Sequence, residues 1–290
     1  MRTTNQFVLG CARFSGKYGI NSKSHINIKS LKKIFSDNKK YIKEIDTAIG
    51  YEKANQKLKS INLKKFRVSS KIPKLNLSDK KLELNTIKKI KDHAEFLKIK
   101  KFEILYLHDP CQVFKKNGFK ILQILDSIKK AKLTKKIGVS VYNPNELGFL
   151  LSKFKPDVVQ IPLNIFDRRF LKKNILKSLK RKKISIYLRS LFLQGILLKD
   201  YKTLPKYFQK WEKLFISWER WVKKKKLKKL EACMSILNIL PKKIKIIIGV
   251  ENDKQLKEIF NSTKIKTFPP KNIFSNNSKL INPSKWLIKK

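Results

Sequence analysis

Short apolar runs alternate with amphipathic segments along this chain of 290 residues. Eight runs are rich in Ile, Val or Leu and are bounded by polar residues, which is the pattern of buried parallel strands. They span residues 7–11, 41–47, 67–71, 103–108, 136–140, 157–161, 184–189 and 244–249. Apolar residues at helical spacing predict helices over residues 24–38, 78–98, 117–132, 143–154, 168–182 and 252–262, with further helix inside 205–238. Ser78 and Pro144 suit the starts of two of these helices.

This alternation predicts a single-domain (β/α)8 TIM barrel, a fold that typically takes about 250 residues. A doubly wound sheet is the alternative, but it usually carries a glycine-rich first turn. The segment LGCARFSGKYG, after the first run, does not match GxGxxG. The composition shows no linker, so we expect one unit over residues 1–290. Its barrel core should cover about residues 5–262, and residues 263–290 should form an irregular tail rich in Asn and Pro.

The carboxyl-terminal ends of the predicted strands carry residues unlike the apolar strand interiors. In chain order they are Cys11, Asp46, Lys71, His108, Ser140, Gln160, Arg189 and Gly249. Since the active site of such a barrel lies at these ends, we expect the residues to converge. Tyr51 follows Asp46 by five positions. A lysine near a tyrosine stabilises the phenolate, so Lys71 and Tyr51 can protonate a carbonyl oxygen while a hydride reaches its carbon.

Each of these residues also has an ordinary structural interpretation. Asp46 can cap a helix, Tyr51 can lie on a helix surface, and His108 can be a core histidine. Their order on successive predicted strands is what favours a catalytic set. We expect His25 and His93 on helix surfaces.

Three tryptophans fall in the long connection over residues 205–238: Trp211, Trp218 and Trp221. Trp218 and Trp221 are three positions apart and can share a helix face packed on the barrel. The alternative is a wall over the pocket on which a sugar stacks.

The formal net charge of +49 first suggests a nucleic acid or an anionic membrane as partner. Only eight of the 70 basic residues are Arg, however, and lysine is spread from Lys17 to Lys290. Bidentate recognition of phosphates and bases favours Arg, so we expect a solvated lysine coat and no nucleic-acid partner. A polyanion-binding surface remains the alternative.

Cysteine use and hydropathy indicate a cytoplasmic protein. Cys11, Cys111 and Cys233 lie far apart without metal-ligand spacing, so we expect reduced thiols and no metal site. The first residues lack the apolar core of a signal peptide, and no run reaches the roughly 18 apolar residues that span a bilayer. We therefore expect no membrane partner.

The chain resembles the aldo/keto reductases over nearly its whole length. The segments that carry the resemblance are LGCARFSGKYGIN, DTAIGY, SSKIPK, ILYLHDP, KIGVSVYNPNEL, DVVQIPLNIFDRR, YLRSLFLQGILL and IIIGVENDKQLKEI. The family consists of (β/α)8 barrels that use a nicotinamide cofactor, usually NADPH, without a Rossmann domain. Through RS-FLQG and NIFD-R the chain also resembles a bacterial subgroup often associated with surface-polysaccharide sugar pathways.

The resemblance implies a catalytic tetrad. Tyr51 matches the general acid, and Lys71 matches the lysine that lowers the pKa of that tyrosine. Asp46 matches the carboxylate that pairs with the lysine, and His108 matches the histidine that orients the substrate carbonyl. The reaction implied is reduction of a small carbonyl compound, such as a keto sugar or a nucleotide-linked sugar.

The resemblance also implies a binding site for NADPH, with NADH as the alternative. Ser140 and Gln160 match residues that hydrogen-bond the nicotinamide carboxamide, and Arg189 replaces an aromatic residue that stacks on the nicotinamide. The residues implied along the pyrophosphate are Ser190, Leu191, Gln194 and Gly195. Near the adenosine phosphate, the resemblance implies Gly249, with Lys254, Lys257 or Gln255 for the 2′-phosphate.

Four residues depart from the family pattern. Lys59 replaces the glycine that usually follows Leu58. Glu52 replaces a glycine, Asn55 replaces a glutamate that helps to hold the adenine, and Val141 replaces an asparagine beside Ser140. These changes and the high charge support an alternative function: a catalytically silent barrel acting as a cofactor sensor or a polyanion-binding protein.

Overall fold

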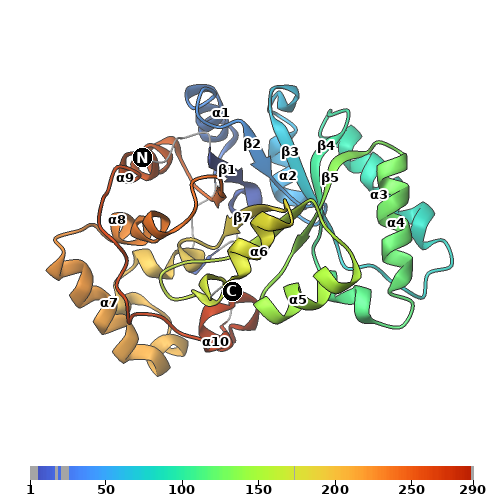
Figure 1. Cartoon of the computed structure of the whole chain (residues 1–290). Helices are drawn as coiled ribbons and strands as arrows, with labels where there is room; N and C mark the ends of the chain where they lie inside the picture. The colour runs from blue at the N-terminus through green and yellow to red at the C-terminus, as the bar shows by residue number, and fades with distance from the viewer. Residues whose placement is uncertain (1–5, 17–18, 21–25, 173, 289–290) are drawn as a thin grey trace.

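The computed structural model describes residues 6–16, 19–20, 26–172 and 174–288. Its eight strands form one closed barrel in chain order, all parallel, so the predicted (β/α)8 fold is confirmed (Figure 1). The strands are β1 (Phe7–Gly10), β2 (Glu44–Asp46), β3 (Arg67–Ile72), β4 (Phe102–Leu107), β5 (Thr134–Ser140), β6 (Val158–Pro162), β7 (Ser185–Arg189) and β8 (Lys245–Ile248). Each strand coincides with one apolar run, because its side chains are buried both inside the barrel and against the helices.

Helices surround the barrel (Figure 1). They are α1 (Ile28–Asp37), α2 (Glu52–Leu58), α3 (Leu82–Phe96), α4 (Phe119–Lys130), α5 (Pro144–Lys153), α6 (Ile175–Arg181), α7 (Glu212–Lys224), α8 (Lys229–Met234), α9 (Asp253–Ser262) and α10 (Ser278–Ile281). The pattern of apolar residues did not predict α2, because seven residues are too few to display helical periodicity. The segment after residue 262, expected to be irregular, contains α10 and a 3-10 turn at Pro283–Lys285.

The two predicted helix starts have different outcomes. Helix α5 begins at Pro144, and the Asn143 side chain accepts the Glu146 N–H at 2.9 Å in a capping box. Helix α3 begins at Leu82, so the prediction that it starts at Ser78 is wrong. The chain before α3 forms a turn instead, in which Asp79 Oδ1 accepts the Lys81 N–H at 2.8 Å.

The amino end of the barrel is closed by a buried carboxylate. Glu44 accepts hydrogen bonds from Arg67 Nη2 at 2.7 Å and from the Tyr187 hydroxyl at 2.8 Å. Lys245 Nζ lies 2.8 Å from the same carboxylate. With both oxygens satisfied, the charge can remain buried at the end opposite to the strands' carboxyl termini.

His93 and Trp218 both pack inward. His93 Nε2 lies 3.0 Å from Ser70 Oγ and its ring stacks on Phe102, so the prediction of a surface histidine is wrong. His25 lies outside the described residues. Trp218 is buried, donates to Leu197 O at 3.3 Å and stacks on Trp221 with ring centroids 5.6 Å apart. This packing agrees with the helix-face interpretation of the tryptophans.

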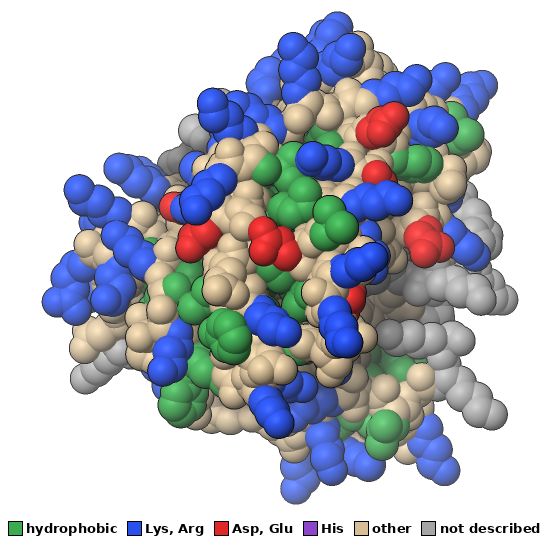
Figure 2. Space-filling view, turned by 90° about the vertical axis from the view of Figure 1, so that its right-hand side faces the viewer, with side chains coloured by type: hydrophobic (Ala, Val, Ile, Leu, Met, Phe, Trp, Pro, Cys, Tyr) green, Lys and Arg blue, Asp and Glu red, His purple; other side chains and the backbone are tan. Residues whose placement is uncertain are grey.

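Lysine and arginine side chains are scattered over the face in Figure 2, with few acidic side chains among them. This distribution agrees with a lysine coat better than with one basic stripe. Across the described ranges, no helix combines the length and hydrophobicity that a bilayer crossing requires. Nor do His, Cys, Asp and Glu side chains in that part of the chain gather into a group able to bind a metal.

Candidate functional site

A cavity of about 640 Å³ opens at the carboxyl ends of the strands. All predicted site residues except Cys11, Lys254 and Lys257 line it: Asp46, Tyr51, Lys71, His108, Ser140, Gln160, Arg189, Ser190, Leu191, Gln194, Gly195, Gly249 and Gln255. Lys254 is exposed on α9, and Lys257 is engaged there by Asp253 at 2.6 Å. Cys11 is buried and does not line the cavity.

The buried centre of the site is an ion pair. Lys71 Nζ contacts Asp46 Oδ1 and also donates to Thr47 O at 3.2 Å. The second oxygen of Asp46 accepts the Gln160 amide at 2.9 Å. Both charged residues are about 95% buried, so the pair is stable only because its hydrogen bonds are satisfied. The Gln160 amide, expected to bind the nicotinamide carboxamide, is therefore also coupled to the ion pair.

Tyr51 lies next to this pair, with Lys71 Nζ 5.7 Å from its ring centroid. Burial raises the pKa of Tyr51, the Asp46 charge raises it further, and the Arg189 charge opposes them. The resemblance implies that Lys71 lowers this pKa, and this role stays a prediction. The Arg189 charge acts on the Tyr51 pKa in that same direction.

His108 follows β4 and faces the same space. Burial lowers the pKa of His108 to about 4, and the charges of Lys71 and Arg189 add to this effect. The ring is therefore neutral at pH 7. A neutral imidazole can donate one hydrogen bond to a carbonyl oxygen without carrying charge.

Asn55 holds the loop that presents Tyr51. Its Oδ1 accepts the Thr47 hydroxyl at 2.7 Å and its Nδ2 donates to Ala48 O at 2.9 Å. Asn55 is buried on α2, and it does not line the cavity. The sequence placed this residue where the family binds adenine. Here it fixes the segment between Asp46 and Tyr51.

Arg189, at the end of β7, has an ordered position. Its guanidinium carbon lies 4.4 Å from the centroid of the Tyr142 ring. Nη2 donates to Val141 O at 3.1 Å and Nη1 to Ser190 Oγ at 3.3 Å. The guanidinium therefore stacks on one aromatic face and is anchored to the end of β5.

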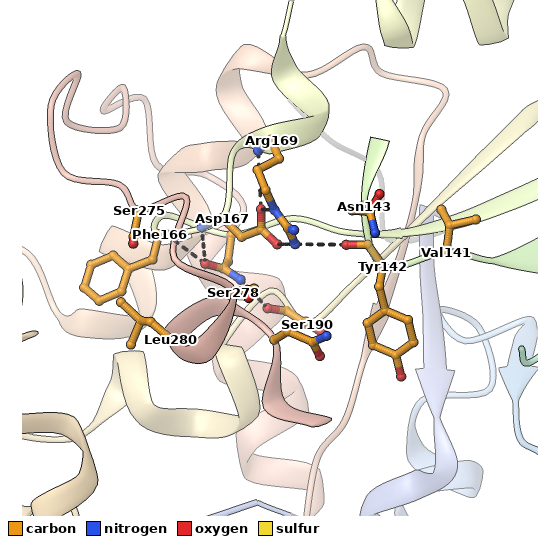
Figure 3. Close-up of polar contacts among 12 residues, drawn as sticks. Val141, Tyr142, Asn143, Phe166, Asp167, Arg169, Ser190, Ser275, Ser278 and Leu280 are labelled. Carbon is orange, nitrogen blue, oxygen red and sulfur yellow. Dashed lines mark hydrogen bonds and ion pairs between the residues drawn. The ribbon is translucent and has the colours of Figure 1, made fainter. Parts of the chain in front are cut away.

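The loop after β6 hydrogen-bonds to Tyr142 and Ser190, which both contact Arg189. Figure 3 shows how Asp167 and Arg169 of this loop lie relative to Tyr142 and Ser190. Fully buried Asp167 accepts two hydrogen bonds from Arg169, at 2.9 and 2.8 Å, and Arg169 Nη2 also donates to Tyr142 O at 2.9 Å. Asn164 Nδ2 donates to Ser190 O at 3.1 Å. Thus the two subgroup motifs, NIFD-R and RS-FLQG, are in direct contact.

The loop after β7 carries several residues in the left-handed region. Ser190 has φ 62°, Leu193 45°, Gln194 52° and Gly195 92°. This conformation is unfavourable for residues with a Cβ, and such strain often accompanies functional loops. The Asn164 contact to Ser190 supports this backbone at its first strained residue.

The sequence did not predict that Arg13 lines the cavity near Gly249. Its side chain lies beside Gly249, where a Cβ would be 3.7 Å from Arg13 Cβ. Arg13 forms an ion pair with Glu251, and Glu251 also contacts the Gln255 amide at 3.3 Å. The tail was missed too, since Pro283 and Ser284 complete the cavity wall.

Comparison with known proteins agrees with the family that the sequence resembles. A model of the aldo/keto reductase family matches residues 6–279. A Pseudomonas aeruginosa protein, provisionally assigned as an aldo-keto reductase, has TM-score 0.64 and 13% identity over 89% of each chain. The glycerol dehydrogenase of Gluconobacter oxydans has TM-score 0.65 and 17% identity, covering 88% of this chain and 86% of that one. At these identities the solved structures establish the fold alone. Curated proteins gave no match.

Proposed function

The chain belongs to the aldo/keto reductase family and is thus an oxidoreductase, and on this premise we propose that it reduces the carbonyl group of a small substrate with a nicotinamide cofactor. Tyr51 is the proposed general acid. One observation carries the proposal: Tyr51 and His108 face the same cavity as the buried Asp46–Lys71 pair. An acid, a neutral hydrogen-bond donor and an ion pair in one enclosed site suit proton transfer to a carbonyl oxygen.

Each residue has a separate task in this mechanism. When bound, the nicotinamide supplies the hydride that reduces the carbonyl carbon. Tyr51 donates its hydroxyl proton to the carbonyl oxygen, and Arg189 stabilises the resulting tyrosinate because its charge lowers the Tyr51 pKa. His108 stays neutral because burial holds its pKa at about 4, and its N–H orients the carbonyl oxygen. The charges of the neighbouring Asp46–Lys71 pair adjust the proton affinity of the Tyr51 hydroxyl.

The cavity residues fit a nicotinamide dinucleotide. The volume of about 640 Å³ is within the range of roughly 300–1,000 Å³ common for ligand sites. Buried Ser140 offers a hydroxyl for the nicotinamide carboxamide, and the strained loop from Ser190 offers backbone groups for the pyrophosphate. Gly249 precedes the amino terminus of α9, where backbone N–H groups favour a phosphate.

We propose NADPH as the cofactor, following the usual choice of the family, with NADH as the alternative. Arg13 beside Gly249 supports a phosphate on the adenosine ribose. Glu251, bound to Arg13, favours the unmodified ribose hydroxyls of NADH, since carboxylates commonly bind them. Titration with NADPH and NADH shows whether Arg13 or Glu251 determines the cofactor preference.

The proposed substrate class is a keto sugar or a nucleotide-linked sugar of a surface-polysaccharide pathway. Its support is the pair of subgroup motifs that contact each other through Asn164 and Ser190. The glycerol dehydrogenase among the similar structures acts, by its name, on a polyol, which is compatible with a sugar-like substrate. We also propose a cytoplasmic location, supported by three cysteines that form no disulfide with one another.

The test of this function is a fluorescence titration of the protein with NADPH and NADH, followed by turnover on a panel of aldehydes and ketones. We expect binding of at least one cofactor and reduction of some members of the panel. Failure to bind either cofactor would contradict the proposal. Binding without turnover would favour the silent cofactor sensor.

The lysine-rich surface supports one competing function, a polyanion-binding protein (Figure 2). Such a protein should bind nucleic acid with a steep dependence on salt concentration. Elution from heparin at moderate salt, with no retained nucleic acid, would count against it.

A further inference from the structure

Within the described part of the chain, four permanently charged basic side chains line the cavity: Arg13, Lys71, Arg189 and Lys229. Three of them contact carboxylates. Arg13 pairs with Glu251, Lys71 with Asp46, and Lys229 with Asp200 and Glu219. Among the described residues, no carboxylate lies within ion-pair distance of Arg189.

Arg189 also has more N–H groups than the hydrogen bonds that it donates. A guanidinium has five N–H groups, and two of them donate, to Val141 O and Ser190 Oγ. Its Nε is buried and has no hydrogen-bond partner among the described residues. A buried charged donor without a partner is costly unless a ligand satisfies it.

This guanidinium is held in place rather than mobile. One face lies on the Tyr142 ring. The Tyr142 carbonyl oxygen is held by Arg169, which is fixed in turn by buried Asp167 (Figure 3). Such a supporting shell keeps a binding group in one orientation. Arg189 also lines the cavity, so its guanidinium is within reach of a ligand there.

Arg189 lies near Tyr51 and His108, at the reacting end of the cavity. Its charge acts on both Tyr51 and His108. The protein as a whole carries a formal charge of +49, which draws anions toward such a site. Guanidinium groups recognise carboxylates and phosphates through paired N–H donors.

We propose that Arg189 determines substrate specificity by binding an anionic group, foremost a carboxylate, of the carbonyl substrate. This inference rests on the proposed carbonyl reduction and narrows its substrate to anionic carbonyl compounds. The same chemistry can recognise a phosphate of the cofactor, so the test has to separate the two sources.

The test compares 4-carboxybenzaldehyde with 4-formylbenzamide, which have similar shapes and differ in charge. For the cofactor-loaded wild-type protein we expect kcat/KM to favour the carboxylate by roughly 10- to 100-fold. Arg189→Gln should reduce this preference to within about threefold, mainly through KM. Arg189→Lys should keep part of it, because lysine retains the charge without the planar fork. Lys180→Gln, which removes a charge from the exposed surface of α6, should leave it unchanged.

A binding measurement keeps the two proposals separable. Calorimetric titration with 4-(hydroxymethyl)benzoate and 4-(hydroxymethyl)benzamide should show the same preference for the anion without any turnover. Failure to reduce any aldehyde would contradict the carbonyl reduction, whereas equal affinity for the two alcohols would overturn the anion site. A cofactor Kd raised about tenfold or more in Arg189→Gln, with the carboxylate preference unchanged, would also overturn it by assigning the guanidinium to the cofactor.

Discussion

On the β2–β3 side of the cavity, the ammonium of Lys71 contacts the carboxylate of Asp46, and both are buried. On the β7 side, the guanidinium of Arg189 contacts a ring, a carbonyl and a hydroxyl. The first arrangement compensates charge internally, whereas the second leaves positive charge directed at the cavity. A compensated pair suits proton transfer, because the site stays near neutral when the substrate arrives. An uncompensated charge suits selection among substrates.

Breaking the compensated pair should have the largest effect on stability. Lys71→Met leaves Asp46 buried without a cation, so we expect a loss of about 3–5 kcal/mol in the free energy of unfolding, measured by denaturant titration. The double variant Asp46→Asn/Lys71→Met should recover most of this stability but no turnover. Lys135→Met removes an exposed lysine from its pair with Glu103 and should cost about 1 kcal/mol or less, because Lys136 stays near the same carboxylate. Equal effects of the two single variants would contradict the comparison.

The part of the barrel around β3 and β4, which contains His93 and His108, should lose stability at low pH. Burial lowers the pKa of His93 and of His108 from 6.5 to about 4. The unfolded chain therefore binds protons that the folded protein does not, and stability present above pH 6.5 is lost as pH falls toward 4. Between pH 7 and pH 5 each histidine should remove about 2 kcal/mol.

Denaturant titrations at several pH values test this prediction. His93→Gln retains a partner for Ser70 Oγ and cannot titrate, so it should flatten the pH dependence by about half. An unchanged slope would show that the buried histidine does not contribute.

On the Arg189 side the expected stability effect is smaller. Asp167→Asn keeps the shape of the side chain but removes the charge that holds Arg169, and we expect a loss of about 1–3 kcal/mol. The KM for a carboxylate aldehyde should rise more than kcat falls, since Tyr142 and Arg189 lose their support. Asp126→Asn, the same change at an exposed position on α4, should alter neither quantity. A fall in kcat alone would place Asp167 in the proton-transfer machinery instead.

The sequence predicted the strands and the reacting end of the site because both depend on local pattern. Apolar runs show the strands, and most runs carry a polar residue at or near the carboxyl end, where the barrel gathers such residues. Asp46, Lys71 and His108 therefore reached the same cavity without knowledge of any contact between them.

What the sequence did not predict depends on contacts between distant segments. Arg13 meets Glu251 across 238 positions, and Pro283 reaches the cavity from the tail. His93 was expected on a helix surface but packs inward from α3. Asn55 was noted only as a departure from the family pattern, because a helix as short as α2 does not show which face packs inward. The effect of the Arg189 charge on the Tyr51 pKa was also hidden, since it depends on the two residues meeting in the folded barrel.

The central claim, that Tyr51 donates the proton, is tested most directly by single-turnover reduction of 4-carboxybenzaldehyde with bound NADPH or NADH. Tyr51→Phe removes one hydroxyl, so the rate of hydride transfer should fall by about 10²- to 10⁴-fold while the cofactor Kd stays within about twofold of wild type. A Tyr51→Phe rate close to that of the wild-type protein would contradict the account.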